Sequence, residues 1–146
     1  MRDIDLAVWH CSATKEGEFF YAHDIDEWHK KRGFRKIGYH IVVLTNGKIQ
    51  YGREIWETGA HAQGYNHNSI GICYVGGLDL KGKPKDTRTS AQRATMKQLK
   101  EYLDYFYPGI KHVGHRDLSV DLNGDGVITP NEWMKACPCF DVKSEL

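Results

Sequence analysis

Short apolar runs separated by polar turns recur along the chain and predict a β-sheet. Residues 5–12 mix apolar and polar positions, whereas residues 69–75 (SIGICYV) form a continuous apolar run that is typical of a buried central strand. Residues 39–44 and 48–51 are two further β-rich runs, and the Asn-Gly pair between them predicts a hairpin with a type I′ turn. A last short strand over residues 112–115 would bring a histidine to the end of the sheet.

Two other segments carry the signals of helices. The first begins near Asp24, a candidate N-cap with an acidic residue three positions later, and it ends at Gly33. The second begins at residue 89 or 90 and ends before the Pro-Gly pair at residues 108–109. Its apolar positions recur at helical spacing and would pack on the sheet. They are Met96, Leu99, Leu103 and Phe106.

Strand geometry places neighbouring side chains on opposite faces of a sheet. His10 and Cys11, near the end of the first strand, therefore face opposite ways, and only one of them can reach a given site. By the same alternation His40 points away from Tyr39. Residues 59–68 (GAHAQGYNHN) show no periodicity and are predicted to form a polar loop, a kind of segment that often lines sites.

The chain has 146 residues, of which 40% are hydrophobic and 27% are charged, with a formal net charge of +1. Length and composition predict one domain, residues 1–146, with its own core. The sequence has no polybasic arm for nucleic acid and no segment long enough to span a membrane. We expect no signal peptide, because the first residues alternate between charged and apolar. We expect a monomer that is made in the cytoplasm and has no stable membrane association. Its four cysteines are expected to be reduced or metal-bound.

Residues 121–132, DLNGDGVITPNE, match the calcium loop of an EF-hand at every specified position. Calcium prefers oxygen ligands, and Gly126 would make the sharp turn between them. The expected ligands are Asp121, Asn123, Asp125, the carbonyl of Val127, Thr129 and Glu132. A Thr-Pro-Asn-Glu cap predicts a short helix from Pro130 toward Ala136. An Asx-rich turn without a metal is the alternative, and a single loop fits a structural calcium site better than a sensor.

Histidine and cysteine on either side of this insert suggest a second metal site. Zinc prefers imidazole and thiolate ligands, and three protein ligands with an open fourth position make a catalytic site. His115 and Cys137 flank the insert, and His10 lies near the end of the first strand. Single histidines are more often surface or structural residues than ligands, and three ligands this far apart form no local signature. From the residues alone, both a zinc site and histidines with an ordinary surface or structural role remain open.

Several motifs, in order along the chain, carry a family resemblance. They are HCSAT at residues 10–14, GYH at 38–40, GYNHNSIG at 64–71, GHRD at 114–117 and KACP at 135–138. Together they resemble the zinc-dependent N-acetylmuramoyl-L-alanine amidases of the phage-lysozyme and peptidoglycan-recognition-protein group. The resemblance covers nearly the whole chain and implies that His10, His115 and Cys137 bind zinc. The calcium-like insert departs from the short connection of the smallest phage enzymes.

The resemblance also implies a mixed α/β fold, in which helices flank a central mixed β-sheet and zinc lies at the floor of a surface groove. It implies hydrolysis of the amide between N-acetylmuramic acid and L-alanine in peptidoglycan, with Tyr39 and Lys135 as catalytic residues. Zinc held by two neutral imidazoles and a thiolate keeps a positive charge for acidifying water and polarising the amide carbonyl. A lysine can stabilise the developing oxyanion, and a tyrosine can transfer a proton. His61, in the polar loop, is a candidate for substrate contact.

Three functions follow from these features. The first is a zinc amidase, either a phage or prophage endolysin that reaches the cell wall after a holin or membrane damage releases it, or a cytosolic muropeptide-recycling enzyme. The second is a peptidoglycan-binding module without catalysis, which loss of the thiol ligand would favour, whereas Cys137 is present. The third is a thiol hydrolase that uses Cys11 or Cys139 with a histidine and needs no metal.

Overall fold

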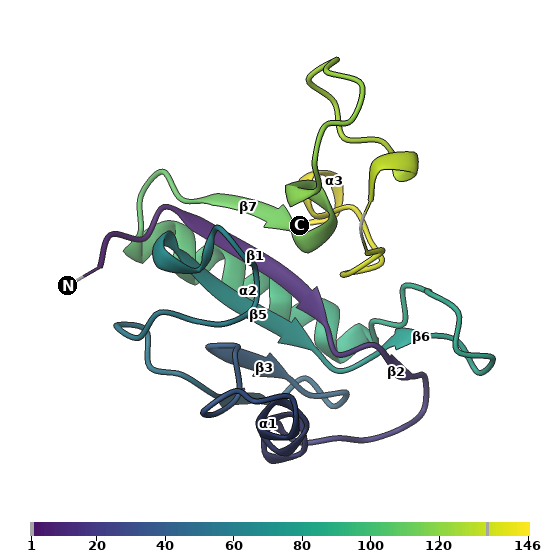
Figure 1. Cartoon of the computed structure of the whole chain (residues 1–146). Coiled ribbons are helices and arrows are strands. Elements are labelled where there is room, and N and C mark those ends of the chain that lie inside the picture. Colours follow the sequence, from purple (N-terminus) through teal and green to yellow (C-terminus); the bar gives the residue numbers. More distant parts are fainter. Residues whose placement is uncertain (1, 134) are drawn as a thin grey trace.

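The computed structural model describes residues 2–133 and 135–146, and its centre is a five-stranded mixed sheet (Figure 1). The strand order is β4-β3-β5-β1-β7. These strands are β1 (Leu6–Cys11), β3 (Ile41–Val43), β4 (Ile49–Tyr51), β5 (Ser69–Tyr74) and β7 (Lys111–Gly114). Neighbouring strands pair in parallel except β4, which is antiparallel to β3 at the edge. The mixed α/β fold class implied by the motifs is confirmed.

β1 and β5 form the middle of the sheet, and every residue of both strands is buried. Both faces are covered, which is why these strands are rich in apolar residues throughout. Trp9 and Cys11 belong to the core on the side of α2 (Ser90–Phe106). Val8 packs in a separate cluster on the opposite face, so alternation places His10 on that second face too. The predicted opposition of His10 and Cys11 is therefore confirmed.

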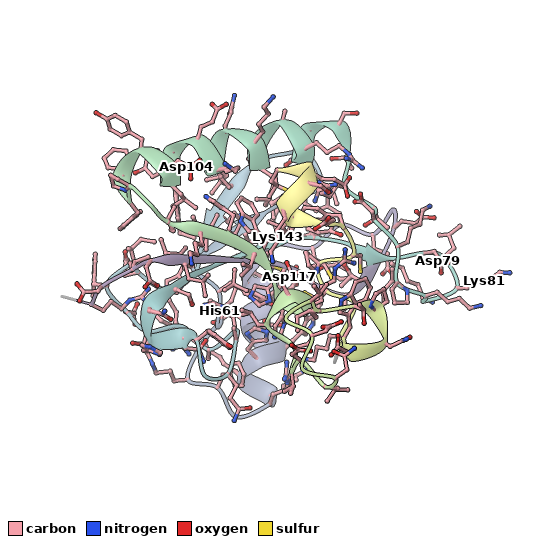
Figure 2. All side chains as sticks on the ribbon, turned by 90° about the horizontal axis from the view of Figure 1, so that it is seen from above. His61, Asp79, Lys81, Asp104, Asp117 and Lys143 are labelled. Atoms are coloured by element: carbon pink, nitrogen blue, oxygen red, sulfur yellow. The ribbon has the colours of Figure 1, made fainter. Side chains whose placement is uncertain are left out.

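The two long helices cover opposite faces of the sheet (Figures 1 and 2). On one face α2 buries Met96, Leu99 and Leu103, as its apolar stripe predicts. Phe106 is 56% exposed, which corrects the prediction for that position. Ten residues of helix turn Phe106 about 80° away from Met96, to the margin of the stripe. On the other face, α1 (Ala22–Lys31) packs through Ile25.

The start of α1 differs from the predicted start at Asp24. The helix begins after Tyr21, and Asp24 is its third residue. The Asp24 carboxylate accepts the Tyr21 backbone N–H at 2.8 Å, so this side chain caps the helix from inside its first turn. At the other end, Gly33 follows the helix with a φ of 96°, which agrees with its predicted role as a stop.

The hairpin of β3 and β4 is confirmed, but its turn is not the predicted two-residue type I′ turn. The Leu44 N–H donates to the Lys48 carbonyl at 2.8 Å, and the Gly47 N–H donates to the Leu44 carbonyl at 2.8 Å. Among the described turn residues, Gly47 alone has a positive φ, of 84°. The connection is a three-residue turn that closes on a left-handed glycine, so Asn46 does not need a positive φ.

Smaller elements complete the chain. A short two-stranded sheet pairs β2 (Thr14–Lys15) with β6 (Gly77–Leu78), and the turn η1 (Asn66–Asn68) precedes β5. Within the two described ranges, no helix is both long and apolar enough to cross a membrane.

After β7 the chain leaves the sheet and forms the green-to-yellow part of Figure 1. It contains the turns η2 (His115–Leu118) and η3 (Pro130–Glu132) and the helix α3 (Val142–Glu145). The predicted helix from Pro130 toward Ala136 is wrong in length. The turn ends at Glu132 because Trp133 has an extended backbone, with φ −66° and ψ 124°. Residue 134, which falls within the predicted helix, lies outside the described residues.

Candidate metal centre

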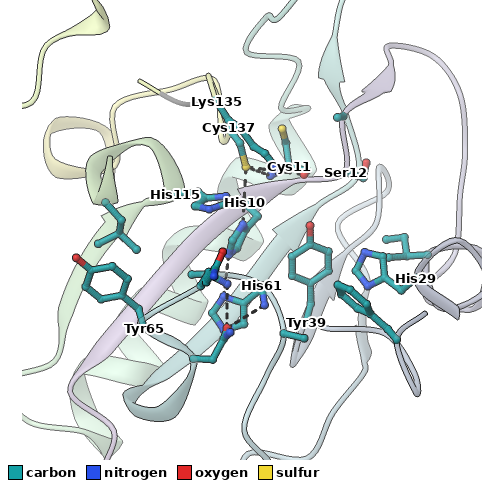
Figure 3. Close-up of a pocket in the computed structure, with 18 of the residues that line it drawn as sticks. His10, Cys11, Ser12, His29, Tyr39, His61, Tyr65, His115, Lys135 and Cys137 are labelled. Carbon is teal, nitrogen blue, oxygen red and sulfur yellow. Dashed lines mark hydrogen bonds between the residues drawn. The ribbon is translucent and has the colours of Figure 1, made fainter. Parts of the chain in front are cut away.

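A pocket of about 800 Å³ opens at the end of β1, on the α1 side of the sheet (Figure 3). Its walls come from five separate parts of the chain: the end of β1, the helix α1, the segment between α1 and β3, the loop before β5 and the segment after β7. The residues of this pocket that sequence singled out are His10, Tyr39, His61, His115, Lys135 and Cys137. The fold thus gathers the predicted zinc ligands, both predicted catalytic residues and the candidate substrate contact around one cavity.

The three predicted zinc ligands lie close together at this pocket. One ligand atom each of His10, His115 and Cys137 lies within 4.8 Å of the others. His10 Nδ1 is 3.8 Å from Cys137 Sγ, and the His10 and His115 ring centroids are 4.7 Å apart. Tetrahedral zinc with ordinary bond lengths needs N and S ligand atoms roughly 3.5 Å apart. The residues therefore fit zinc in both donor type and spacing.

Burial keeps the imidazoles of the cluster neutral. His10 is 1% exposed, and burial followed by the neighbouring His61 holds its pKa well below the usual value. Burial and then the Lys135 ammonium lower the pKa of His115. Burial also lowers the pKa of His61 to about 3. A neutral imidazole has a free lone pair on one nitrogen, which is the form that binds a metal.

Backbone contacts hold Cys137 against the end of β1. The Cys11 N–H donates to Cys137 Sγ at 3.2 Å and holds the sulfur beside the last residue of β1. The Arg116 N–H donates to the Cys137 carbonyl at 2.8 Å and ties this residue to the turn that carries His115. The Asp117 carboxylate accepts the Gly114 N–H at 2.7 Å and shapes the start of the same turn.

Two contacts that hold the segment after β7 in place could not be predicted from the sequence. The Tyr74 hydroxyl, at the end of β5, donates to the Pro138 carbonyl at 2.7 Å and is fully buried. The Arg116 guanidinium lies 3.9 Å from the centroid of the Trp133 ring. Each contact joins residues that are distant in sequence or irregular in spacing, so neither a motif nor a periodicity could indicate it.

Tyr39 and Lys135 reach the pocket from opposite sides of the cluster (Figure 3). The Tyr39 ring centroid is 5.0 Å from that of His10, and burial raises the pKa of Tyr39 well above its usual value. Its hydroxyl is thus a neutral donor. Lys135 is exposed, and within the described part of the chain its ammonium has no hydrogen bond or ion pair. It is free to meet a negative charge in the pocket.

The two remaining histidines of interest have different surroundings. His61 lines the pocket, but its Nδ1 lies 2.9 Å from His10 Nε2, so its ring is engaged with a predicted ligand. His40 is fully buried and accepts the Gly71 N–H through Nδ1 at 3.0 Å. Its Nε2 lies 2.8 Å from the Glu57 carbonyl. His40 therefore points away from the pocket, as strand alternation predicts.

In the insert, the carboxylates of Asp121, Asp125 and Glu132 lie within 4.8 Å of one another. They accept hydrogen bonds from their own loop, as when Asp121 accepts the N–H groups of Gly124 at 3.1 Å and Gly126 at 2.7 Å. The Asn123 side chain likewise accepts the Asp125 N–H at 3.2 Å. These bonds are also those of an Asx-rich turn without a metal. Calcium binding by these residues and Val127 stays a prediction.

Two imidazoles and a thiol converge on one pocket, an arrangement that is consistent with a zinc site. The sequence is more specific, because residues 1–139 match the N-acetylmuramoyl-L-alanine amidase family and the chain belongs to this family. It is an enzyme of the peptidoglycan amidase class, which confirms the predicted reaction type.

Related proteins agree with this assignment. The endolysin of Escherichia phage T7 is 38% identical over 139 residues, which are 95% of this chain and 83% of the phage protein. An uncharacterized protein of Haemophilus influenzae is 52% identical over 101 residues, or 69% of this chain and 87% of that protein.

Solved structures show the same fold. The N-acetylmuramoyl-L-alanine amidase LysC from Clostridium intestinale superposes with a TM-score of 0.73 at 24% identity, covering 96% of this chain and 79% of LysC. Wild-type Drosophila PGRP-LB superposes with a TM-score of 0.70 at 22% identity, covering 94% of this chain and 76% of that chain.

Proposed function

We propose that this chain is a zinc-dependent amidase that cleaves the bond between N-acetylmuramic acid and L-alanine in peptidoglycan. In this proposal His10, His115 and Cys137 are the zinc ligands, and Tyr39 and Lys135 are the catalytic residues. The observation that carries it is the convergence of all five residues on one pocket, from β1, the start of the hairpin and the segment after β7.

The cluster has the chemistry that a catalytic zinc site requires. Two neutral imidazoles and one thiolate leave a net positive charge on the metal and an open fourth position. When bound, zinc supplies this charge to acidify water and to polarise the amide carbonyl. The pocket beside the cluster provides room for the substrate amide at that open position.

The residues around the cluster perform the remaining steps. The Lys135 ammonium, which has no competing carboxylate within the described residues, stabilises the negative charge that develops on the carbonyl oxygen. The Tyr39 hydroxyl, kept protonated by burial, donates a hydrogen bond to the reacting oxygen or to the leaving nitrogen. Two donors on opposite sides of the cluster hold the amide in one orientation.

We further propose that the enzyme acts as an endolysin. The T7 and T3 phage endolysins are 38% and 39% identical to this chain over more than nine tenths of its length. In this role residues 1–146 form one monomeric amidase domain, which reaches the wall after a holin or membrane damage releases it. A muropeptide-recycling amidase would use the same pocket and would differ in acting on soluble fragments instead of intact wall.

The other two functions are less well supported by the site. A thiol hydrolase needs a reactive thiolate, yet the hydrogen bond with Cys137 and burial raise the pKa of Cys11 to about 12. The hydrogen bond with Cys11 and burial likewise raise the pKa of Cys139. A binding module without catalysis would not need Cys137, Tyr39 and Lys135 in one pocket, where all three are present.

Calcium is a further proposed cofactor, with a structural role in the insert. The support is the complete match of residues 121–132 to the EF-hand pattern and the approach of three carboxylates to within 4.8 Å. Calcium would replace loop N–H groups as the partner of these oxygens and would stabilise the segment between His115 and Cys137.

The test of the proposed function is digestion of purified peptidoglycan by the intact protein. We expect newly exposed L-alanine amino groups and no new reducing sugar ends. A zinc chelator should stop the release, and added zinc should restore it. Reducing ends without L-alanine amino groups, or full activity after complete zinc removal, would refute the proposal.

A further inference from the structure

We infer that His61 is a positioning residue, which accepts the proton of His10 Nε2 and thereby leaves His10 Nδ1 free to bind the metal. The inference rests on the proposed function, because it concerns how a zinc ligand is oriented. It also replaces the role in substrate contact that sequence suggested for His61.

The two nitrogens of His10 have different neighbours. Nδ1 is 3.8 Å from Cys137 Sγ and faces the cluster, whereas Nε2 is 2.9 Å from His61 Nδ1 and faces away from it (Figure 3). A neutral imidazole carries one proton, and a ligand nitrogen must not carry it. With Nδ1 as the ligand atom, the proton lies on Nε2 and is donated to His61.

The proton arrangement of His61 follows from that bond. Its Nδ1 accepts from His10, so its own proton lies on Nε2, which is 3.3 Å from the Oγ of the fully buried Ser69. Both nitrogens of His61 are then occupied by protein partners. No nitrogen is left for a substrate contact, although the ring borders the pocket.

Two glycines make room for the His61 ring. A Cβ at Gly71, in β5, would lie 2.6 Å from the ring, and a Cβ at Gly59 would lie 2.6 Å from its Cδ2. The Asn66 side-chain oxygen accepts the backbone N–H groups of His61 and Ala62, each at 2.9 Å. Close packing against the two glycines therefore fixes the position of the ring, and the hydrogen bonds from Asn66 fix the backbone of the loop that carries it.

The neighbouring His40 does not compete for this role. Its ring centroid is 5.8 Å from that of His61, but its nitrogens are engaged by the Gly71 N–H and the Glu57 carbonyl. Partners that hold the second nitrogen of a metal-bound histidine typically raise metal affinity by about 10- to 100-fold. His61 is the group placed to have this effect on His10.

The first test measures zinc affinity by competition with a chelator. His61→Leu removes the acceptor and should lower zinc affinity about 10- to 100-fold. His61→Asn places a carbonyl oxygen where Nδ1 lies and should restore most of the affinity. His67→Leu, which removes an exposed histidine from the same loop, is the matched control and should bind zinc like the wild type. Equal zinc affinity in His61→Leu and the wild type would overturn the inference.

A kinetic comparison separates positioning from substrate contact. With a soluble muropeptide and saturating zinc, His61→Leu should keep the wild-type KM. A raised KM with unchanged zinc affinity would instead assign His61 to the substrate and overturn the inference.

The second test uses the wild-type protein without zinc, so it does not depend on a variant that folds. Nitrogen NMR of the histidine rings should show His10 protonated at Nε2 and His61 protonated at Nε2. Protonation of His10 at Nδ1 would contradict the inference even if zinc binds. A wild type that binds no zinc but shows the expected protonation would refute the proposed function and leave the His10–His61 contact standing.

Discussion

The two sides of the candidate zinc site are built in different ways. His10 belongs to β1, whose six residues are all buried between β5 and β7. His115 and Cys137 belong to the segment after β7, which is mostly turns and whose insert has exposed side chains at Leu122 and Val127. One ligand is thus fixed by the core of the fold, and the other two are brought to it by a segment with little core of its own.

The two regions therefore position their ligands in different ways. The buried strand β1, together with the contact between His61 and His10, can fix the position of His10 without a metal. The end of the segment after β7 packs into the core of the sheet through Phe140 and Val142. The part that carries the ligands is joined to the sheet by specific contacts, such as Cys11 N–H to Cys137 Sγ and Tyr74 hydroxyl to the Pro138 carbonyl. Zinc would therefore act as a further link between the two regions, since bound metal contributes directly to stability.

Removing the thiol ligand should have the largest effect, because it breaks that link. Cys137→Ala is expected to lose zinc binding, measured by metal content after dialysis, and with it all amidase activity. Cys139→Ala removes a thiol two residues away, whose Sγ contacts the Gly77 carbonyl instead, and should keep both properties. A Cys137→Ala protein with full activity would contradict the ligand assignment.

Removing Lys135 should affect chemistry and leave the metal in place. Lys135→Ala is expected to bind zinc normally and to lose about 10²- to 10³-fold in kcat, the usual cost of one oxyanion-stabilising donor. The exposed Lys143 offers a control, because it lies outside the pocket and its replacement by alanine should leave kcat unchanged. Wild-type turnover in Lys135→Ala would exclude a catalytic role.

Calcium binding to residues 121–132 should stabilise only the segment after β7, which carries His115 and Cys137. Titration calorimetry is expected to show one calcium ion bound per chain. Calcium should also raise the melting temperature, because at a calcium concentration of 100 times Kd it adds about 2.7 kcal/mol to the free energy of unfolding. Both signals should disappear in Asp121→Ala.

Asp79→Ala is the control, because Asp79 also accepts two loop N–H groups, at 2.9 Å each, but belongs to the loop after β6, which Figure 1 shows well apart from the insert. Identical calcium signals in Asp121→Ala and the wild type would leave the Asx-rich turn as the correct interpretation.

The smallest effect is expected where the two regions meet at Tyr74. Tyr74→Phe leaves the buried Pro138 carbonyl without its donor and should cost about 1–3 kcal/mol of unfolding free energy, measured in urea. Zinc affinity should fall slightly because Cys137 is adjacent to Pro138. Unchanged stability would show that this hydrogen bond does not join the segment to the sheet.

The parts of the fold that local patterns describe could be predicted from the sequence. Apolar runs indicated the strands, and helical spacing placed Met96, Leu99 and Leu103 on the sheet. The prediction for Phe106 is wrong because this residue lies at the margin of the apolar stripe, and spacing alone does not show how far round the helix the core extends. The Asn-Gly signal indicated the hairpin, yet the turn type depends on how Leu44 and Lys48 pair across it.

The site could be predicted only in part, because its ligands are distant in sequence. Motifs indicated His10, His115 and Cys137 through a family resemblance, and the structure places them together. The helix predicted after Pro130 was too long because a local cap does not ensure that a helix continues. The placement of His61 beneath His10 depends on β1 and the loop lying side by side, which only the folded chain establishes.

The most direct test of a site made by two regions is the X-ray absorption spectrum of the zinc-loaded protein. Ligands from the sheet and the segment predict two imidazole nitrogens at about 2.0–2.1 Å, one sulfur at about 2.3 Å and one further light atom from solvent. A zinc shell without sulfur, or with more than one sulfur, would contradict the joining of His10, His115 and Cys137 at a single metal.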